Sequence, residues 1–106
     1  MRKYSTLING FLWNVEFVDR EKIQGNDGQT KPNDLLICIA NDLNPNAMRL
    51  SFIHELTHAL LDTQGRCYQK KFDLEELCEF IAWNNWYIAE KVLEFDREFD
   101  KELREQ

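Results

Sequence analysis

The sequence predicts an α+β fold in which a small antiparallel-type sheet, formed by an N-terminal hairpin plus one further strand, packs on two helices. Within residues 11–18, large apolar side chains recur at every second position, directly after the hairpin-favouring pair Asn9-Gly10. From residue 46 onwards, apolar residues recur instead at helical spacing. A chain of 106 residues has room for one core, so residues 1–106 are expected to form a single domain.

The expected strands lie in the first forty residues. Tyr4–Ile8 and Phe11–Val18 form the hairpin, because asparagine and glycine both tolerate the positive φ of a two-residue turn. Residues 19–34 are polar and rich in turn residues, with room for a very short strand at 28–30. The continuous apolar run Leu35–Ala40 predicts a third strand with both faces covered.

Two helices are expected to complete the fold. The first runs from about residue 46 to residue 62 and ends before Gly65, which suits a left-handed C-terminal position. The second begins at Asp73, where Glu76 three residues later forms the pattern of a capping box. Its predicted apolar stripe consists of Leu74, Leu77, Cys78, Ile81, Asn85, Ile88, Val92, Phe95 and Phe99.

The aromatic residues of the last helix allow two interpretations each. Phe95 and Phe99 are either a homodimer contact beyond the edge of the small domain or, the favoured alternative, rings packed on the sheet. Trp83 and Trp86 either line a substrate cleft or, again favoured, pack in the core.

Composition narrows the class of function. The formal net charge is −6 and the lysines and arginines are scattered, which argues against binding of nucleic acid. The N-terminus lacks the pattern of a signal peptide, and no apolar run approaches the roughly 20 residues needed to span a membrane. Three cysteines without a C-x-x-C pair fit reduced, structural thiols. These features predict a cytoplasmic protein that does not bind membranes.

The strongest chemical signal is the H-E-x-x-H motif formed by His54, Glu55 and His58 inside the first helix. Residues four apart share one helix face, so the two imidazoles are placed to bind one zinc ion. Glu55 then lies beside the metal, where a carboxylate serves as general base. Both histidines of the chain belong to this motif.

A catalytic zinc ion usually has three protein ligands, so a third must come from elsewhere. A third histidine is absent from the sequence, which excludes the longer motif that ends in another histidine. Cys67 and Tyr68 lie near in sequence, but Glu75, Glu76 and Glu79 at the start of the last helix are better candidates. Relative to the expected apolar stripe, Glu75 falls about 105° and Glu76 about 155° from the centre, which favours Glu75. Glu79 is placed to orient a ligating histidine.

H-E-x-x-H followed on the next helix by E-x-x-small-acidic, here Glu75 to Glu79, resembles the gluzincin metallopeptidases. The short length and the hairpin–strand–helix–helix order are similar to minimal phage and bacterial members, with the ImmA/IrrE-type peptidases as relatives. The resemblance implies a minimal zincin-like fold and a phage or mobile-element origin. It also implies that His54, His58 and Glu75 bind Zn²⁺, that Glu55 is the general base and that Glu79 supports the ligands.

The expected function is therefore hydrolysis of a peptide bond in a protein substrate by a zinc-activated water, with Glu55 accepting the proton. A substrate strand is expected to pair with an exposed edge of the Leu35–Ala40 strand, and Tyr68 and Tyr87 are candidates for stabilising the oxyanion. The alternative is a non-catalytic interaction protein that zinc stabilises. Glu55 favours the peptidase, because a purely structural site needs no carboxylate between its ligands.

Overall fold

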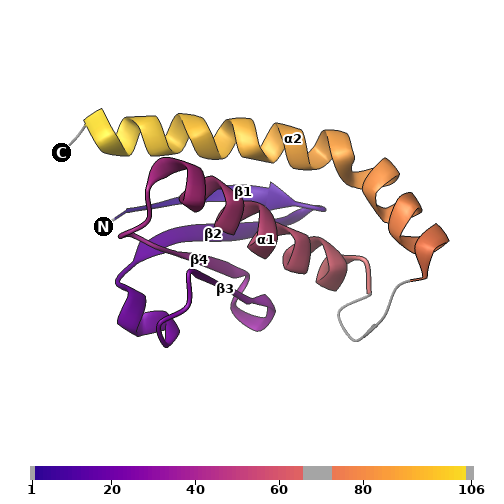
Figure 1. Cartoon of the computed structure of the whole chain (residues 1–106), viewed down its shortest axis with the longest axis horizontal. Coiled ribbons are helices and arrows are strands. Elements are labelled where there is room, and N and C mark those ends of the chain that lie inside the picture. The colour runs from indigo at the N-terminus through magenta and orange to yellow at the C-terminus, as the bar shows by residue number, and fades with distance from the viewer. Residues whose placement is uncertain (1, 66–72, 105–106) are drawn as a thin grey trace.

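The computed structural model describes residues 2–65 and 73–104, with side chains up to residue 100, and confirms an α+β architecture of a four-stranded sheet and two α-helices (Figure 1). Each expected strand and helix is present, with its predicted ends displaced by at most one residue. The strands are β1 (Lys3–Ile8), β2 (Phe11–Val18), β3 (Gly28–Lys31) and β4 (Leu36–Ala40). The helices are α1 (Pro45–Thr63) and α2 (Leu74–Arg104), and short 3₁₀ segments η1 (Arg20–Ile23) and η2 (Pro32–Asp34) precede β3 and β4.

The sheet is mixed, which corrects the expected antiparallel type. Its strand order is β1-β2-β4-β3, and β2 pairs with β4 in parallel while the outer pairs are antiparallel. The hairpin forms as predicted, with φ of 47° at Asn9 and 86° at Gly10. Apolar β4 takes a central place and polar β3 the edge, because a central strand has both faces covered.

The position of β4 overturns one prediction. The Leu35–Ala40 strand was expected to offer a free edge to a substrate, but β4 is hydrogen-bonded on both sides, to β2 and to β3. Within the described sheet, the outer strands are β1 and β3. A peptide that extends this sheet would therefore pair with one of those two strands.

Both helices cover the same face of the sheet. Phe95 of α2 stacks on Phe52 of α1 with ring centroids 4.4 Å apart, and it also contacts Phe17 of β2. Lys91 of α2 donates a hydrogen bond of 2.9 Å to Thr6 of β1, and both residues are buried. The fully buried side chains of this core include Ile8, Trp13, Val15, Ile37, Ile39, Leu56 and Leu60. The opposite face is partly covered by η1, whose Ile23 packs with Cys38 and Ala40.

The helix starts follow the capping rules. Asn44 accepts a hydrogen bond of 2.8 Å from the Ala47 amide, and Pro45 occupies the first turn, where its missing amide is not needed. Asp73 likewise accepts a hydrogen bond of 2.8 Å from the Glu76 amide, which confirms the predicted cap of α2. Gly65, after α1, has a φ of +74°, as expected for a left-handed residue at a helix end.

The packed face of α2 differs from the predicted stripe in its first half. Phe80, Asn84, Lys91 and Phe95 are buried, whereas the predicted stripe residues Leu74, Leu77 and Ile81 are 75%, 45% and 55% exposed. Cys78 and Asn85 are also exposed. The first turns of α2 project past the β1–β2 turn (Figure 1), so apolar side chains there have no sheet beneath them.

The aromatic residues of α2 divide between core and solvent. Phe95 is buried and Phe99 is partly buried and packs against it, as the favoured interpretation predicted. The interpretation of Trp83 and Trp86 as core residues was wrong, because they are 85% and 81% exposed.

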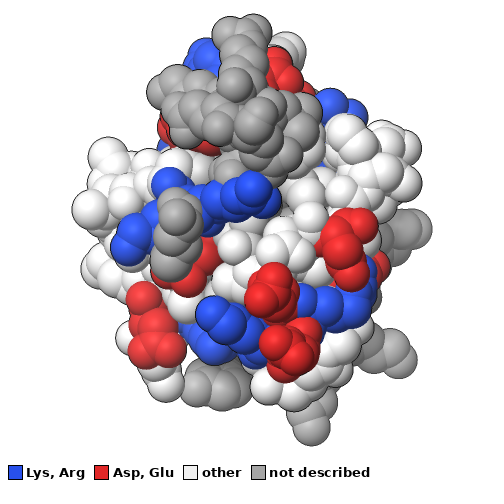
Figure 2. Space-filling model, turned by 90° about the vertical axis from the view of Figure 1, so that its left-hand side faces the viewer, with Lys and Arg blue, Asp and Glu red and all other residues white. Residues whose placement is uncertain are grey.

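Charged side chains of both signs are interspersed over the face of the molecule shown in Figure 2. The scatter of lysine and arginine along the sequence is thus also a scatter over this face of the molecule. Within the described ranges, neither helix is both long and apolar enough to cross a membrane.

Candidate metal centre

The two histidines lie one turn apart on the exposed face of α1. Both are exposed, and the His54 side chain has 68% of its surface accessible. Their ring centroids are 5.0 Å apart, with an angle of 69° between the rings. Because an imidazole nitrogen binds zinc at about 2.0–2.1 Å, rings at this separation can direct one nitrogen each at the same ion. The geometry therefore fits two ligands of one metal.

Glu55 turns from the helix towards the edge of the sheet and is only 7% exposed. The Thr30 hydroxyl of β3 donates a hydrogen bond of 2.9 Å to Glu55 Oε1 and also lies 2.9 Å from the Glu55 carbonyl oxygen. The second carboxylate oxygen, Oε2, lies 4.0 Å from His54 Nε2. One oxygen is thus held by the sheet, while the other is next to a candidate metal ligand.

Gly28 makes this approach of strand and helix possible. A Cβ atom at position 28 would lie 2.9 Å from Glu55 Cγ, 3.0 Å from Glu55 Oε2 and 3.2 Å from the Cys38 carbonyl oxygen. Gly28 pairs with Ile39 and Thr30 with Ile37, so both point to the sheet face that α1 covers. Only glycine leaves room for the Glu55 carboxylate at this point of β3.

An open cleft of about 430 Å³ lies beside Glu55, between the start of β3 and the first half of α1. His54 and Glu55 lie on its wall, so the candidate metal ligand and the buried carboxylate face the same space. A cleft of this volume is in the range of small-ligand and peptide side-chain sites. Its lining residues are Asn26, Asp27, Gly28, Ala47, Leu50, Ser51, His54 and Glu55.

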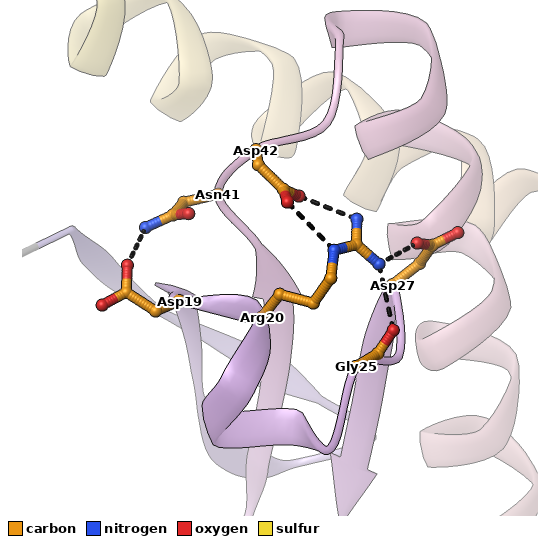
Figure 3. A network of polar contacts seen from close by, with 6 residues as sticks. All are labelled: Asp19, Arg20, Gly25, Asp27, Asn41 and Asp42. Carbon is orange, nitrogen blue, oxygen red and sulfur yellow. Dashed lines mark hydrogen bonds and ion pairs between the residues drawn. The ribbon is translucent and has the colours of Figure 1, made fainter.

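A polar network fixes the rim of the cleft (Figure 3). The Arg20 guanidinium makes two hydrogen bonds to Asp42, of 3.0 and 2.7 Å, and one of 2.6 Å to Asp27. Asn41 donates a hydrogen bond of 2.9 Å to Asp19. These contacts tie the connection between β2 and β3 to the turn after β4. Asp27 belongs both to the network and to the cleft lining, so the network positions the start of β3.

The same network shifts the pKa values of two of its side chains. Hydrogen bonds to Asp42 and Asp27 raise the pKa of the Arg20 guanidinium above its ordinary value. The hydrogen bond from Arg20 lowers the pKa of the Asp42 carboxyl below its ordinary value of 3.8. Both shifts favour the charged forms, so the Arg20–Asp42 pair is ionised at neutral pH.

The predicted third ligand is not brought to the histidines. Glu75 is exposed, and in the described part of the chain no group of three His, Cys, Asp or Glu side chains is arranged to hold a metal. Measured from the buried side of α2, Glu75 points about 170° away, Glu79 about 150° and Glu76 about 90°. The helical-wheel argument that favoured Glu75 took Leu77, Cys78 and Ile81 as the centre of the packed face, but these three residues are exposed.

The remaining sequence candidates lie elsewhere. The Tyr87 hydroxyl, a candidate for the oxyanion, accepts a hydrogen bond from the Asn9 amide and donates one to the Leu7 carbonyl, both of 3.0 Å. Tyr87 thus braces the hairpin turn. Cys67 and Tyr68 fall outside the described residues.

Gly28 and Thr30 are site residues that the sequence did not reveal as such. The short strand at 28–30 was expected, and residues that are two apart in a strand lie on the same face of the sheet. The sequence did not indicate that this strand forms the edge of the sheet next to α1.

Comparisons with protein-family models, with curated proteins and with solved structures found no match to this chain.

Proposed function

We propose that this protein is a zinc-dependent metallopeptidase with a minimal zincin-like fold, of the gluzincin type and of phage or mobile-element origin. The observation that carries the proposal is the arrangement of His54, Glu55 and His58. The histidines share an exposed helix face with rings 5.0 Å apart, and the carboxylate between them is buried against an edge strand beside an open cleft. A histidine pair that served only solubility would not need a buried carboxylate held from a strand.

His54 and His58 would hold the metal, and zinc bound there would supply Lewis-acid polarisation of a substrate carbonyl and a nucleophile at neutral pH. Glu55 acts as general base: it accepts a proton from the attacking water and returns it to the leaving amine. Thr30 keeps one carboxylate oxygen engaged, which leaves Oε2 for proton transfer on the side of His54. Burial restricts the rotamers of Glu55, so the base is oriented before substrate binds.

The substrate strand is proposed to pair with β3 rather than with β4. β3 is an outer strand, and Gly28 on it lines the cleft together with His54 and Glu55. A peptide hydrogen-bonded along β3 would pass directly over the Glu55 carboxylate. Extended segments of a protein substrate are therefore the expected ligands.

On the basis of the sequence motif, Glu75 remains the proposed third zinc ligand. Binding of zinc by Glu75 together with the two histidines requires a change in the position of α2. In the structure the first turn of α2 projects past the sheet, with Glu75 on its outer side. Zinc binding through Glu75 would rotate and draw this turn towards α1. Zinc binding would then be coupled to the position of the first turns of α2.

The proposal is tested by peptide release from a denatured, mixed protein substrate, with zinc-loaded wild type and Glu55→Gln side by side. The wild type is expected to cleave and to lose activity with a chelator. Glu55→Gln, which is nearly isosteric, is expected to bind zinc normally and to lose at least about 100-fold in kcat, because it cannot accept the proton. Full activity of a folded, zinc-loaded Glu55→Gln protein would exclude this mechanism.

A non-catalytic protein stabilised by zinc is the competing proposal. The exposure of Trp83 and Trp86 favours it, because large exposed aromatic side chains are typical of binding surfaces. This alternative predicts that zinc raises the thermal stability of wild type and Glu55→Gln equally, with no peptide release from either protein.

A further inference from the structure

The outer face of α2 carries apolar side chains that the proposed peptidase site does not use. Trp83, Trp86 and Leu93 are 85%, 81% and 63% exposed. Figure 1 shows α2 along one side of the molecule, with its far side open to solvent over these turns. Scattered single apolar residues on a surface are normal, but Trp83 and Trp86 are neighbours on one helix face and Leu93 lies two turns further along it.

These residues belong to a regular seam, here defined as Glu79, Trp83, Trp86, Glu90, Leu93 and Arg97. The steps between successive members are four and three residues in alternation, the spacing with which one helix packs along another. All six are exposed. The seam is centred about 150° from the buried side of α2, so a second helix can approach it without disturbing the core.

We infer that this seam binds a second copy of the chain, with the two α2 helices antiparallel around a twofold axis near Ile88. Each member then faces a seam member of the partner: Trp83 faces the partner's Leu93, Trp86 faces the partner's Glu90 and Glu79 faces the partner's Arg97. The first pairing is apolar on both sides. The last pairing joins opposite charges, and the twofold axis repeats it at the other end of the seam.

Charge selects this partner and this direction. In a parallel pair, Glu79, Glu90 and Arg97 would each face an identical charge, which disfavours that arrangement. The formal net charge of −6 and two glutamates within the seam also disfavour an anionic lipid surface as the partner. In the antiparallel dimer, Glu79 and Arg97 form an opposite-charge pair at each end of the seam, and the tryptophans are covered.

The size of the seam indicates a weak dimer. Two tryptophans and one leucine offer roughly 500 Å² per copy, or about 1,000 Å² in total, at the lower end of specific interfaces. Dissociation in the micromolar range is therefore expected.

The test is sedimentation equilibrium of the full chain from about 1 μM to about 500 μM, a range that brackets micromolar dissociation. The average mass of the wild type is expected to rise from that of one chain towards that of two. Trp83→Ala with Trp86→Ala is expected to weaken dimerisation at least 100-fold, because tryptophans dominate interface energies. Leu12→Glu, at a residue that is 60% exposed on the hairpin, is the control and leaves dimerisation unchanged.

A charge exchange tests the pairing itself. Glu79→Arg alone and Arg97→Glu alone each place like charges at both ends of the seam and are expected to weaken dimerisation about tenfold. The double variant exchanges the charges and restores wild-type dissociation. A wild type that stays monomeric throughout the range, a double variant no better than the single ones, or binding to vesicles of anionic phospholipid in place of dimerisation would each overturn the inference. Glu79 is the one seam residue that the proposed zinc site also uses. The test is run without zinc, so its outcome does not depend on the proposed peptidase activity.

Discussion

Glu55 contacts two residues of β3, and it is the buried glutamate among those whose side chains the structure describes. Thr30 donates a hydrogen bond to its carboxylate, and Gly28 leaves the space that its Cγ and Oε2 atoms occupy. A buried carboxylate that had no such partner would be costly. The strand thus lowers the cost of placing a carboxylate between two histidines.

Gly28→Ala is expected to lower the free energy of unfolding by about 1–3 kcal/mol, because the new Cβ atom would lie 2.9 Å from Glu55 Cγ. Urea denaturation measures this difference. The matched control is the same substitution in a Glu55→Ala background, which removes the two nearest atoms, Glu55 Cγ and Oε2, and leaves the Cys38 carbonyl oxygen at 3.2 Å. The cost of Gly28→Ala should fall there to well under half; an equal cost in both backgrounds would mean that Glu55 does not occupy this space.

At the scale of elements, ion pairs hold the connection between β2 and β3 in place. Arg20 binds Asp42 and Asp27 on both sides, and the cleft rim depends on this bridge. Because the pKa of Asp42 is lowered in the folded protein, its contribution to stability is fully present above the unfolded value. That contribution is lost as the pH falls through the lowered folded value.

Asp42→Asn is therefore expected to lower the urea midpoint at pH 7, with a difference from wild type that shrinks below the ordinary pKa of 3.8 and vanishes at lower pH. Urea titrations between about pH 2 and pH 7 check this. Asp100→Asn, at an exposed acid near the end of α2, serves as the control and should change little at any pH. A pH-independent effect of Asp42→Asn would show that the Arg20 bridge does not stabilise the fold through the Asp42 charge.

Local patterns predicted the elements well and their arrangement less well. The Asn9-Gly10 turn, the Asp73 cap and the limits of the strands follow from residues close in sequence, and the structure contains them. The apolar run of β4 predicted that both its faces are covered, but its central place depends on which strands pair along its two edges, here β2 and β3, and that is a property of the whole sheet. The packed face of α2 was misjudged at Leu74 to Ile81, because sequence spacing does not reveal where the sheet ends beneath a long helix.

For the whole molecule, the candidate site joins two elements in a way that the sequence motif does not contain. His54, Glu55 and His58 were found by their spacing, whereas the edge strand that seats Glu55 was found only through the fold. The third ligand remained a choice among acidic residues at the start of α2. Its assignment depends on the position of the first turn of α2 relative to α1, which no short-range pattern specifies.

Alanine substitution of each acidic candidate tests the third ligand. If Glu75 binds the metal, Glu75→Ala should weaken zinc binding by at least about 100-fold, more than the loss of an outer hydrogen-bond partner. Glu79→Ala should cost about tenfold as such a partner, and Glu76→Ala should cost less. Competition titration with a zinc chelator measures all three affinities. Equal affinities for wild type and Glu75→Ala would remove Glu75 from the site.

Zinc binding by the histidine pair is the claim on which the proposed function depends, and zinc titration of the purified chain tests it most directly. The wild type is expected to bind one zinc ion per chain, and His54→Ala and His58→Ala are each expected to lose that binding while remaining folded, since both side chains are exposed. A wild type that binds no zinc, or histidine variants that bind zinc as tightly as the wild type, would contradict the proposal.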